Sequence, residues 1–117
     1  MKLGYMTFRV RDIEKSIHFY QELVGLKVIR RFNPGMGEIA FVANEENETM
    51  LEFIQFEEEE KVETKGMVMS FSANEELNTL REKARLMGLE PTEIIAEGVK
   101  PAYFQVCDPD GIIVEFS

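Results

Sequence analysis

The feature of this sequence that most constrains its fold is an order of predicted elements that occurs twice. Apolar residues at every second position predict strands, and apolar residues at helical spacing predict helices. In the first half the elements are a strand over 3–10, a helix over 13–24 and strands over 26–32, 38–43 and 50–56. In the second half they are a strand over 67–73, a helix over 75–87 and strands over 89–96, 102–107 and 112–116. The sequence therefore predicts an α+β fold of two β-α-β-β-β repeats.

Both predicted helices carry residues that are typical of helix ends. Asp12 stands at the expected N-cap of the first helix, and Gly25 stands just after its last turn. Asn74 and Gly88 hold the corresponding positions in the second half. Strands this short cannot bury both of their faces by themselves. We therefore expect the helices to lie on the convex side of a cupped mixed sheet, with the other side open to a ligand.

Length and charge limit the possible partners. The 117 residues are enough for a single domain with repeat one at about 1–57, an acidic linker at about 57–65 and repeat two at about 66–117. Thirteen Lys and Arg against 22 Asp and Glu give a net charge of −9. Phosphate backbones and anionic membrane surfaces repel such a chain, so we expect neither nucleic acid nor membrane as a partner.

The cellular compartment that we expect rests on features that are missing from the sequence. No apolar run approaches the roughly 18 residues that span a bilayer, and the first residues do not resemble a signal peptide. Cys107 is the single cysteine, which excludes an intrachain disulfide. We therefore expect a cytoplasmic protein.

Two stretches of the sequence resemble a known family. One runs from Phe8 to Tyr20 and continues through Leu23-Val24-Gly25-Leu26, and the other runs from Asp108 to Phe116. They are similar to the opening and closing signatures of the glyoxalase / bleomycin-resistance / extradiol-dioxygenase group, the vicinal oxygen chelate superfamily. The paired repeats are that family's architecture, so the resemblance covers the whole chain. Many different activities share this fold, so the resemblance alone does not assign one.

The resemblance also implies where a metal would bind. Enzymes of the family hold a divalent metal with His and Glu side chains from the first and last strands of each repeat. Those positions fall here on Tyr5, Glu52, Met69 and Glu115, with Met67 or Phe71 replacing Met69 if the register slips. Both carboxylates are kept and both histidines are absent. Because Zn, Ni, Co and Fe sites need imidazole or thiolate ligands, we expect no cofactor, although two carboxylates could hold Mg²⁺ or Mn²⁺ weakly.

The two acids are the candidate functional residues. Glu52 and Glu115 each interrupt an apolar strand, and burial of an unpaired carboxylate is costly. We expect both to line the cavity with a partner, which could be Arg9, a proton shared between them or a cationic ligand. If the protein is an enzyme, they are its candidate acid–base groups. The full set of residues expected to line the ligand site is Tyr5, Thr7, Arg9, Glu52, Met69, Phe71, Tyr103, Gln105 and Glu115.

These observations favour a small-molecule binding protein of the glyoxalase/bleomycin-resistance type with a degenerate, metal-free cavity. Two negative charges in one cavity favour ligands that carry a protonated amine. Because family members close the cavity by pairing repeats within or between chains, we expect a homodimer. The alternative is a metal-dependent lyase, isomerase or dioxygenase of the same superfamily, similar to lactoylglutathione lyase. The missing histidines favour the binding protein, whereas the retained acids favour the enzyme.

Overall fold

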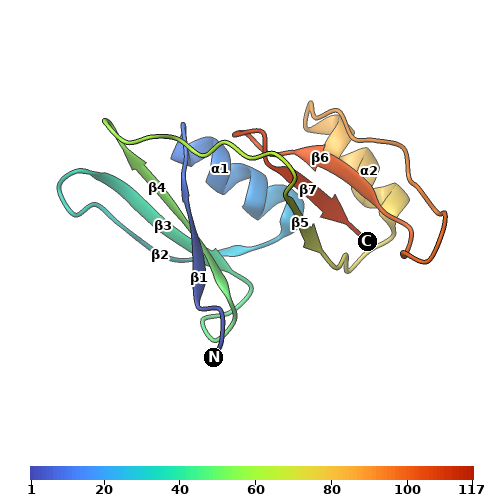
Figure 1. Cartoon of the computed structure of the whole chain (residues 1–117), viewed down its shortest axis with the longest axis horizontal. Coiled ribbons are helices and arrows are strands. Elements are labelled where there is room, and N and C mark those ends of the chain that lie inside the picture. The colour runs from blue at the N-terminus through green and yellow to red at the C-terminus, as the bar shows by residue number, and fades with distance from the viewer. The chain divides into compact units, whose positions relative to one another are not determined.

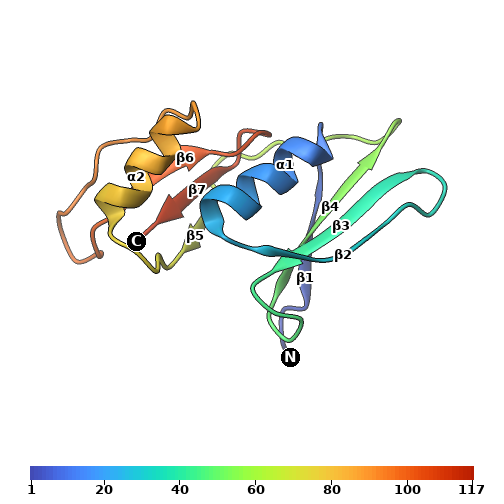
Figure 2. The ribbon, with the colours of Figure 1, turned by 180° about the vertical axis from the view of Figure 1, so that it is seen from behind.

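A computed structural model describes residues 1–117. The chain divides into two compact units, Met1–Glu63 and Thr64–Ser117. In each unit a helix lies across one face of a small mixed sheet (Figures 1 and 2). The predicted α+β fold is therefore confirmed. Neither helix is long and apolar enough to cross a membrane.

The first unit is built around a four-stranded sheet. Its elements are strand β1 (Tyr5–Arg9), helix α1 (Ile13–Phe19), a π-helical turn η1 (Tyr20–Val24) and strands β2 (Lys27–Phe32), β3 (Gly37–Ala43) and β4 (Met50–Phe56). The strand order is β1-β4-β3-β2, with β1 parallel to β4 and the other pairs antiparallel. Phe8, Phe53 and Val42 are buried on one face, and Ile17 and Tyr20 are buried on the helix that covers it. This packing leaves the opposite face of the sheet without a helix.

The ends of the first helical segment follow the sequence signals. The side chain of Asp12 accepts hydrogen bonds from the backbone N–H groups of Glu14 and Lys15, as an N-cap should. Gly25 ends the segment in the left-handed region at φ 85°. The predicted helix over 13–24 is present, but its last five residues are π-helical instead of α-helical.

A glycine is required where the β2–β3 hairpin enters β3. Gly37 has φ 143°, and a Cβ atom added there would lie 2.1 Å from the backbone oxygen of Gln55. A side chain at this position would push β3 away from β4, so the close pairing of these strands depends on glycine.

The second unit is smaller. It contains strand β5 (Val68–Phe71), helix α2 (Leu77–Leu86) and strands β6 (Phe104–Cys107) and β7 (Ile113–Phe116). The strand order is β5-β7-β6, with β5 parallel to β7 and β6 antiparallel to it. Phe104, Phe116 and Val114 of the sheet are buried, as are Leu80 and Ala84 of the helix.

Two sequence predictions in this unit are wrong. The predicted strand over 89–96 is reduced to one bridge between Ile95 and Tyr103. Pro91 has no N–H, and the Thr92 hydroxyl accepts the hydrogen bond of the Gln105 N–H that a backbone carbonyl would take in a ladder. Asn74 is not the N-cap, because the chain still pairs with Ser117 at Ala73 and the helix starts later.

The predicted acidic linker belongs to the first unit for most of its length. The Val62 N–H donates to the Arg9 carbonyl over 2.8 Å, and the Lys61 ammonium donates to the Phe56 carbonyl over 2.8 Å. These contacts hold the segment against the sheet, and the boundary between the units follows at Glu63.

Candidate functional site

The open face of the first unit carries four of the predicted residues, Tyr5, Thr7, Arg9 and Glu52. Alternation along β1 places Tyr5, Thr7 and Arg9 on the face opposite to the buried Phe8. Thr7 pairs with Glu52 across the parallel strands, and the Thr7 hydroxyl donates to a Glu52 carboxylate oxygen over 2.5 Å. Phe41 is the neighbour of Glu52 on β3, and the rings of Tyr5 and Phe41 are perpendicular to each other with 5.4 Å between their centroids. Glu52 is thus a half-buried acid beside one hydroxyl and two aromatic rings.

Arg9 has a different partner from the one considered above. Its guanidinium lies 2.9 Å from the carboxylate of Glu59 in the acidic segment, so Arg9 does not neutralise Glu52. A hollow of about 340 Å³ lies between this segment and β1, lined by Thr7, Arg9, Glu60, Lys61 and Val62. The acidic segment therefore forms one wall beside the predicted site residues.

The second unit places Glu115 in an unusual environment for a carboxylate. The residue is only 5% exposed. Its carboxylate accepts a hydrogen bond from the Gln105 amide at 3.0 Å, and both of its oxygens lie 3.3 Å from the Lys100 ammonium. The same ammonium nitrogen lies 4.3 Å from the centre of the Tyr103 ring. Glu115 and Tyr103 therefore flank one cation, which the chain itself supplies, and Gln105 holds the carboxylate.

Met69 and Phe71, two residues of the predicted ligand set, lie on the opposite side of the sheet from Glu115. Met69 pairs with the buried Val114, and Phe71 stacks on Phe116 with 6.3 Å between ring centroids. The residue of β5 that pairs with Glu115 is Ser70. Because side chains alternate along a strand, Met69 and Phe71 lie on the core side of the sheet.

The register also identifies the counterpart of Tyr5. Thr7 pairs with Glu52 in the first unit, and Ser70 pairs with Glu115 in the second. The residue two positions before Thr7 is Tyr5, and the residue two positions before Ser70 is Val68. Val68 is 47% exposed. The match between Met6-Thr7-Phe8 and Met69-Ser70-Phe71 is the sequence signal that selects Val68. Sequence reasoning missed Lys100 because it lies in an irregular loop that no pattern places.

The donor groups at these positions do not fit a transition metal. The four positions carry the phenol of Tyr5, the carboxylates of Glu52 and Glu115, and the isopropyl group of Val68, which has no donor atom. The Glu115 carboxylate is already engaged by a cation and an amide. Within neither unit do three His, Cys, Asp or Glu side chains gather as metal ligands would. Zn, Ni and Fe bind tightly only where imidazole or thiolate contributes.

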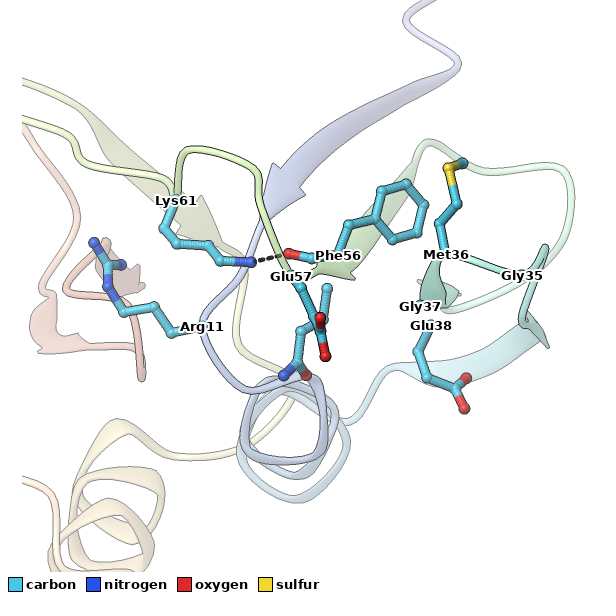
Figure 3. A pocket seen from close by; sticks show the side chains of 9 residues that line it. Arg11, Gly35, Met36, Gly37, Glu38, Phe56, Glu57 and Lys61 are labelled. Atoms are coloured by element: carbon cyan, nitrogen blue, oxygen red, sulfur yellow. Dashed lines mark hydrogen bonds between the residues drawn. The ribbon is translucent and has the colours of Figure 1, made fainter.

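A separate pocket of about 770 Å³ opens in the first unit (Figure 3). Its lining comes from the β2–β3 turn, the end of β4 and the acidic segment, and consists of Arg11, Gly35, Met36, Gly37, Glu38, Gln55, Phe56, Glu57 and Lys61. The Gln55 side-chain oxygen accepts the N–H of Ile13 over 2.8 Å, which fixes one wall. None of the residues predicted from the sequence lines this pocket.

The residues with shifted pKa values described below lie away from both open faces. A hydrogen bond to Glu14 raises the pKa of Arg31, with a further contribution from Glu38. A hydrogen bond from Arg85 lowers the pKa of Glu82 on the exposed side of α2. Both pairs lie outside the candidate site.

The fold agrees with comparisons to known proteins. The chain belongs to the Glyoxalase/Bleomycin resistance protein/Dioxygenase superfamily, whose model matches residues 2–116. It is similar to the uncharacterized protein YwbC of Bacillus subtilis (strain 168), with 31% identity over 123 residues that cover 98% of this chain and 95% of that protein.

Solved structures show the same fold. TnmS3, an antibiotic binding protein from Streptomyces sp. CB03234, superposes with a TM-score of 0.77 at 18% identity, over 100% of this chain and 94% of that chain. A mutant of glyoxalase I from Zea mays superposes with a TM-score of 0.83 at 21% identity, over 98% of this chain but 44% of that chain. At these identities the likeness concerns the fold, since antibiotic binding and glyoxalase structures share it.

Proposed function

We propose that this protein binds a small organic molecule on the open faces of its sheets without a resident metal ion. The observation that supports this proposal most strongly is the chemistry of the side chains at the expected metal-ligand positions. A valine replaces one expected ligand, a tyrosine replaces another, and Lys100 lies against the carboxylate of Glu115. The similarity in fold to an antibiotic binding protein supports binding as a function that this architecture performs.

The chemistry around Glu52 supports an amine-bearing aromatic ligand. Glu52 has a neutral hydroxyl as its hydrogen-bond partner, and Arg9 is engaged by Glu59. Tyr5, which is 56% exposed, offers an aromatic surface beside it. The net charge of −9 attracts cations to the surface. A protonated amine at the carboxylate and an aromatic ring against Tyr5 would satisfy both groups.

The test compares benzylamine with benzyl alcohol, two probes of similar shape that differ in charge. The full chain is titrated in buffer with EDTA, and the amide resonances of Thr7 and Glu52 are followed by NMR. We expect benzylamine to shift them at lower concentration than benzyl alcohol, and we expect Glu52→Gln to remove the difference. Glu46→Gln, an equal charge change in an exposed turn, should keep it. Equal binding of both probes by the parent would refute the proposed ligand chemistry.

The alternative is a metal-dependent lyase, isomerase or dioxygenase. The retention of a carboxylate on the last strand of each unit favours it, as does the likeness in fold to glyoxalase I. The two functions differ in one observable. The enzyme would bind its substrate only after addition of a divalent metal such as Ni²⁺ or Mn²⁺, whereas the proposed protein binds in EDTA.

A further inference from the structure

We propose that Tyr103, Gln105 and Glu115 form a subsite for an alkylammonium group, and that Lys100 occupies this subsite as an intramolecular competitor. This inference rests on the proposed binding function and adds a second ligand group to it. The structure itself displays the recognition, because an ammonium nitrogen lies 3.3 Å from both oxygens of the Glu115 carboxylate and 4.3 Å from the centre of the Tyr103 ring.

The subsite needs a cation. Glu115 is 5% exposed, and its remaining partner is the neutral amide of Gln105 at 3.0 Å. A buried carboxylate without a counter-charge is strongly unfavourable. Removal of Lys100 from the subsite is therefore favourable only when another cation takes its place.

Lys100 can leave the subsite easily. Its side chain is 56% exposed, and it lies in a loop that contains neither helix nor strand between Ile95 and Tyr103. The neighbouring Val99 is fully exposed, so few contacts hold the loop in place. An exposed ammonium loses little when it returns to water. The cost of displacement thus falls on Glu115, and an incoming ammonium group offsets it.

The arrangement also predicts which cations bind best. An aromatic face beside a carboxylate attracts ammonium groups through the ring quadrupole as well as through charge. Methylated ammonium groups are held by these two interactions without a need for hydrogen bonds. Choline and its neutral isostere 3,3-dimethyl-1-butanol have nearly the same shape, so they isolate the contribution of charge.

The experiment measures binding of both compounds to the full chain by NMR. We expect choline to bind Lys100→Ala about tenfold more tightly than the parent, because the competitor is gone while the aromatic face and carboxylate remain. 3,3-Dimethyl-1-butanol should bind both proteins equally weakly. Lys65→Ala removes the same charge from another exposed position of this unit and should leave choline binding unchanged. Tyr103→Leu in the Lys100→Ala background should remove most of the gain.

A second measurement keeps the test valid if Lys100→Ala does not fold. In the parent labelled with ¹³C-lysine, choline should shift the εCH₂ resonance of Lys100 as it leaves the Tyr103 ring, and 3,3-dimethyl-1-butanol should not. The subsite is wrong if choline binds Lys100→Ala no better than the parent, or if that resonance does not respond to choline. Either result leaves the benzylamine test at Glu52 unaffected, so failure of the subsite is distinguishable from failure of the proposed function.

Discussion

Glu52 and Glu115 hold corresponding positions in the two units, yet they have different surroundings. Each lies on the last strand of its unit and pairs with a small hydroxyl residue of the first strand, Thr7 or Ser70. Glu52 is half-buried and bonded to the Thr7 hydroxyl. Glu115 is 5% exposed and bonded to an ammonium and an amide.

The difference shows that the fold fixes the positions of the two acids, whereas loops and neighbouring segments determine their interaction partners. In the first unit the arginine on the same face is engaged by the acidic segment. In the second unit the loop before β6 delivers a lysine to the acid. On one face the carboxylate therefore accepts a hydrogen bond from a neutral hydroxyl, and on the other it forms an internal ion pair.

The largest expected effect tests whether the two units have matched cores. Phe53 and Phe116 follow the two acids directly and are 1% and 2% exposed. Phe53→Ala and Phe116→Ala should each lower the free energy of unfolding by about 3–5 kcal/mol, since each leaves a large cavity. Urea unfolding followed by circular dichroism measures both losses. A loss below about 1 kcal/mol in one variant would mean that its unit does not have the tight core described here.

The next effect separates the two acids. Lys100→Ala leaves the buried Glu115 with the Gln105 amide alone, so we expect it to lower the free energy of unfolding by about 1–3 kcal/mol. Glu52→Gln keeps an acceptor for the Thr7 hydroxyl and should change it by less than about 0.5 kcal/mol. Chemical denaturation measures both, with Lys65→Ala as the charge control. If Lys100→Ala is as stable as the control, Glu115 does not depend on its ion pair.

A smaller effect concerns the arginines near each helix. Arg31 on β2 binds Glu14 of α1 and Glu38 of β3. Arg81 on α2 donates to the Thr92 carbonyl over 2.7 Å and lies 3.2 Å from Glu93. Arg31→Lys and Arg81→Lys keep the charge but lose the planar fork, and each should lower the free energy of unfolding by about 0.5–1 kcal/mol. Thermal unfolding at low and high salt measures them, and a loss in neither variant would show that these contacts are incidental.

The smallest expected effect is a change in the pKa of one carboxyl group on α2. Arg85 lowers the pKa of Glu82 through a hydrogen bond, so Arg85→Gln should raise that pKa toward its ordinary value. A lowered carboxyl pKa stabilises the fold above the unfolded-state pKa, and this stabilisation is lost as the pH falls through the folded-state value. Carbon-detected NMR titration of Glu82 follows the change, with Lys83→Gln as the control. An unchanged Glu82 pKa in Arg85→Gln would contradict the assigned cause.

The sequence predicts the scaffold well because the scaffold depends on local signals. Asp12 and Gly25 fix the ends of the first helical segment, and alternation finds seven of the eight predicted strands. The eighth strand, predicted over 89–96, does not form, because Pro91 has no N–H and the Thr92 hydroxyl accepts the hydrogen bond that a backbone carbonyl would take in a ladder.

The candidate site is harder to predict from sequence because it depends on register and on loops. A shift of one residue in β5 exchanges Met69 for Val68 or Ser70 and turns a core residue into a site residue. Lys100 reaches Glu115 from a loop whose path no periodicity describes. The acids themselves can be recognised in the sequence, because burial of a carboxylate in an apolar strand is costly unless a partner pairs with it.

The most direct test of the central claim is the metal content of the full chain. The protein is purified without chelator, incubated with Zn²⁺ and Ni²⁺, dialysed against EDTA and measured by inductively coupled plasma mass spectrometry. We predict much less than about one ion per chain, because Tyr5 and Val68 supply no imidazole beside Glu52 and Glu115. The Tyr5→His/Val68→His double variant restores those imidazoles and should retain more metal than the parent. One Zn²⁺ or Ni²⁺ per parent chain after this dialysis would contradict the metal-free account and favour the enzyme.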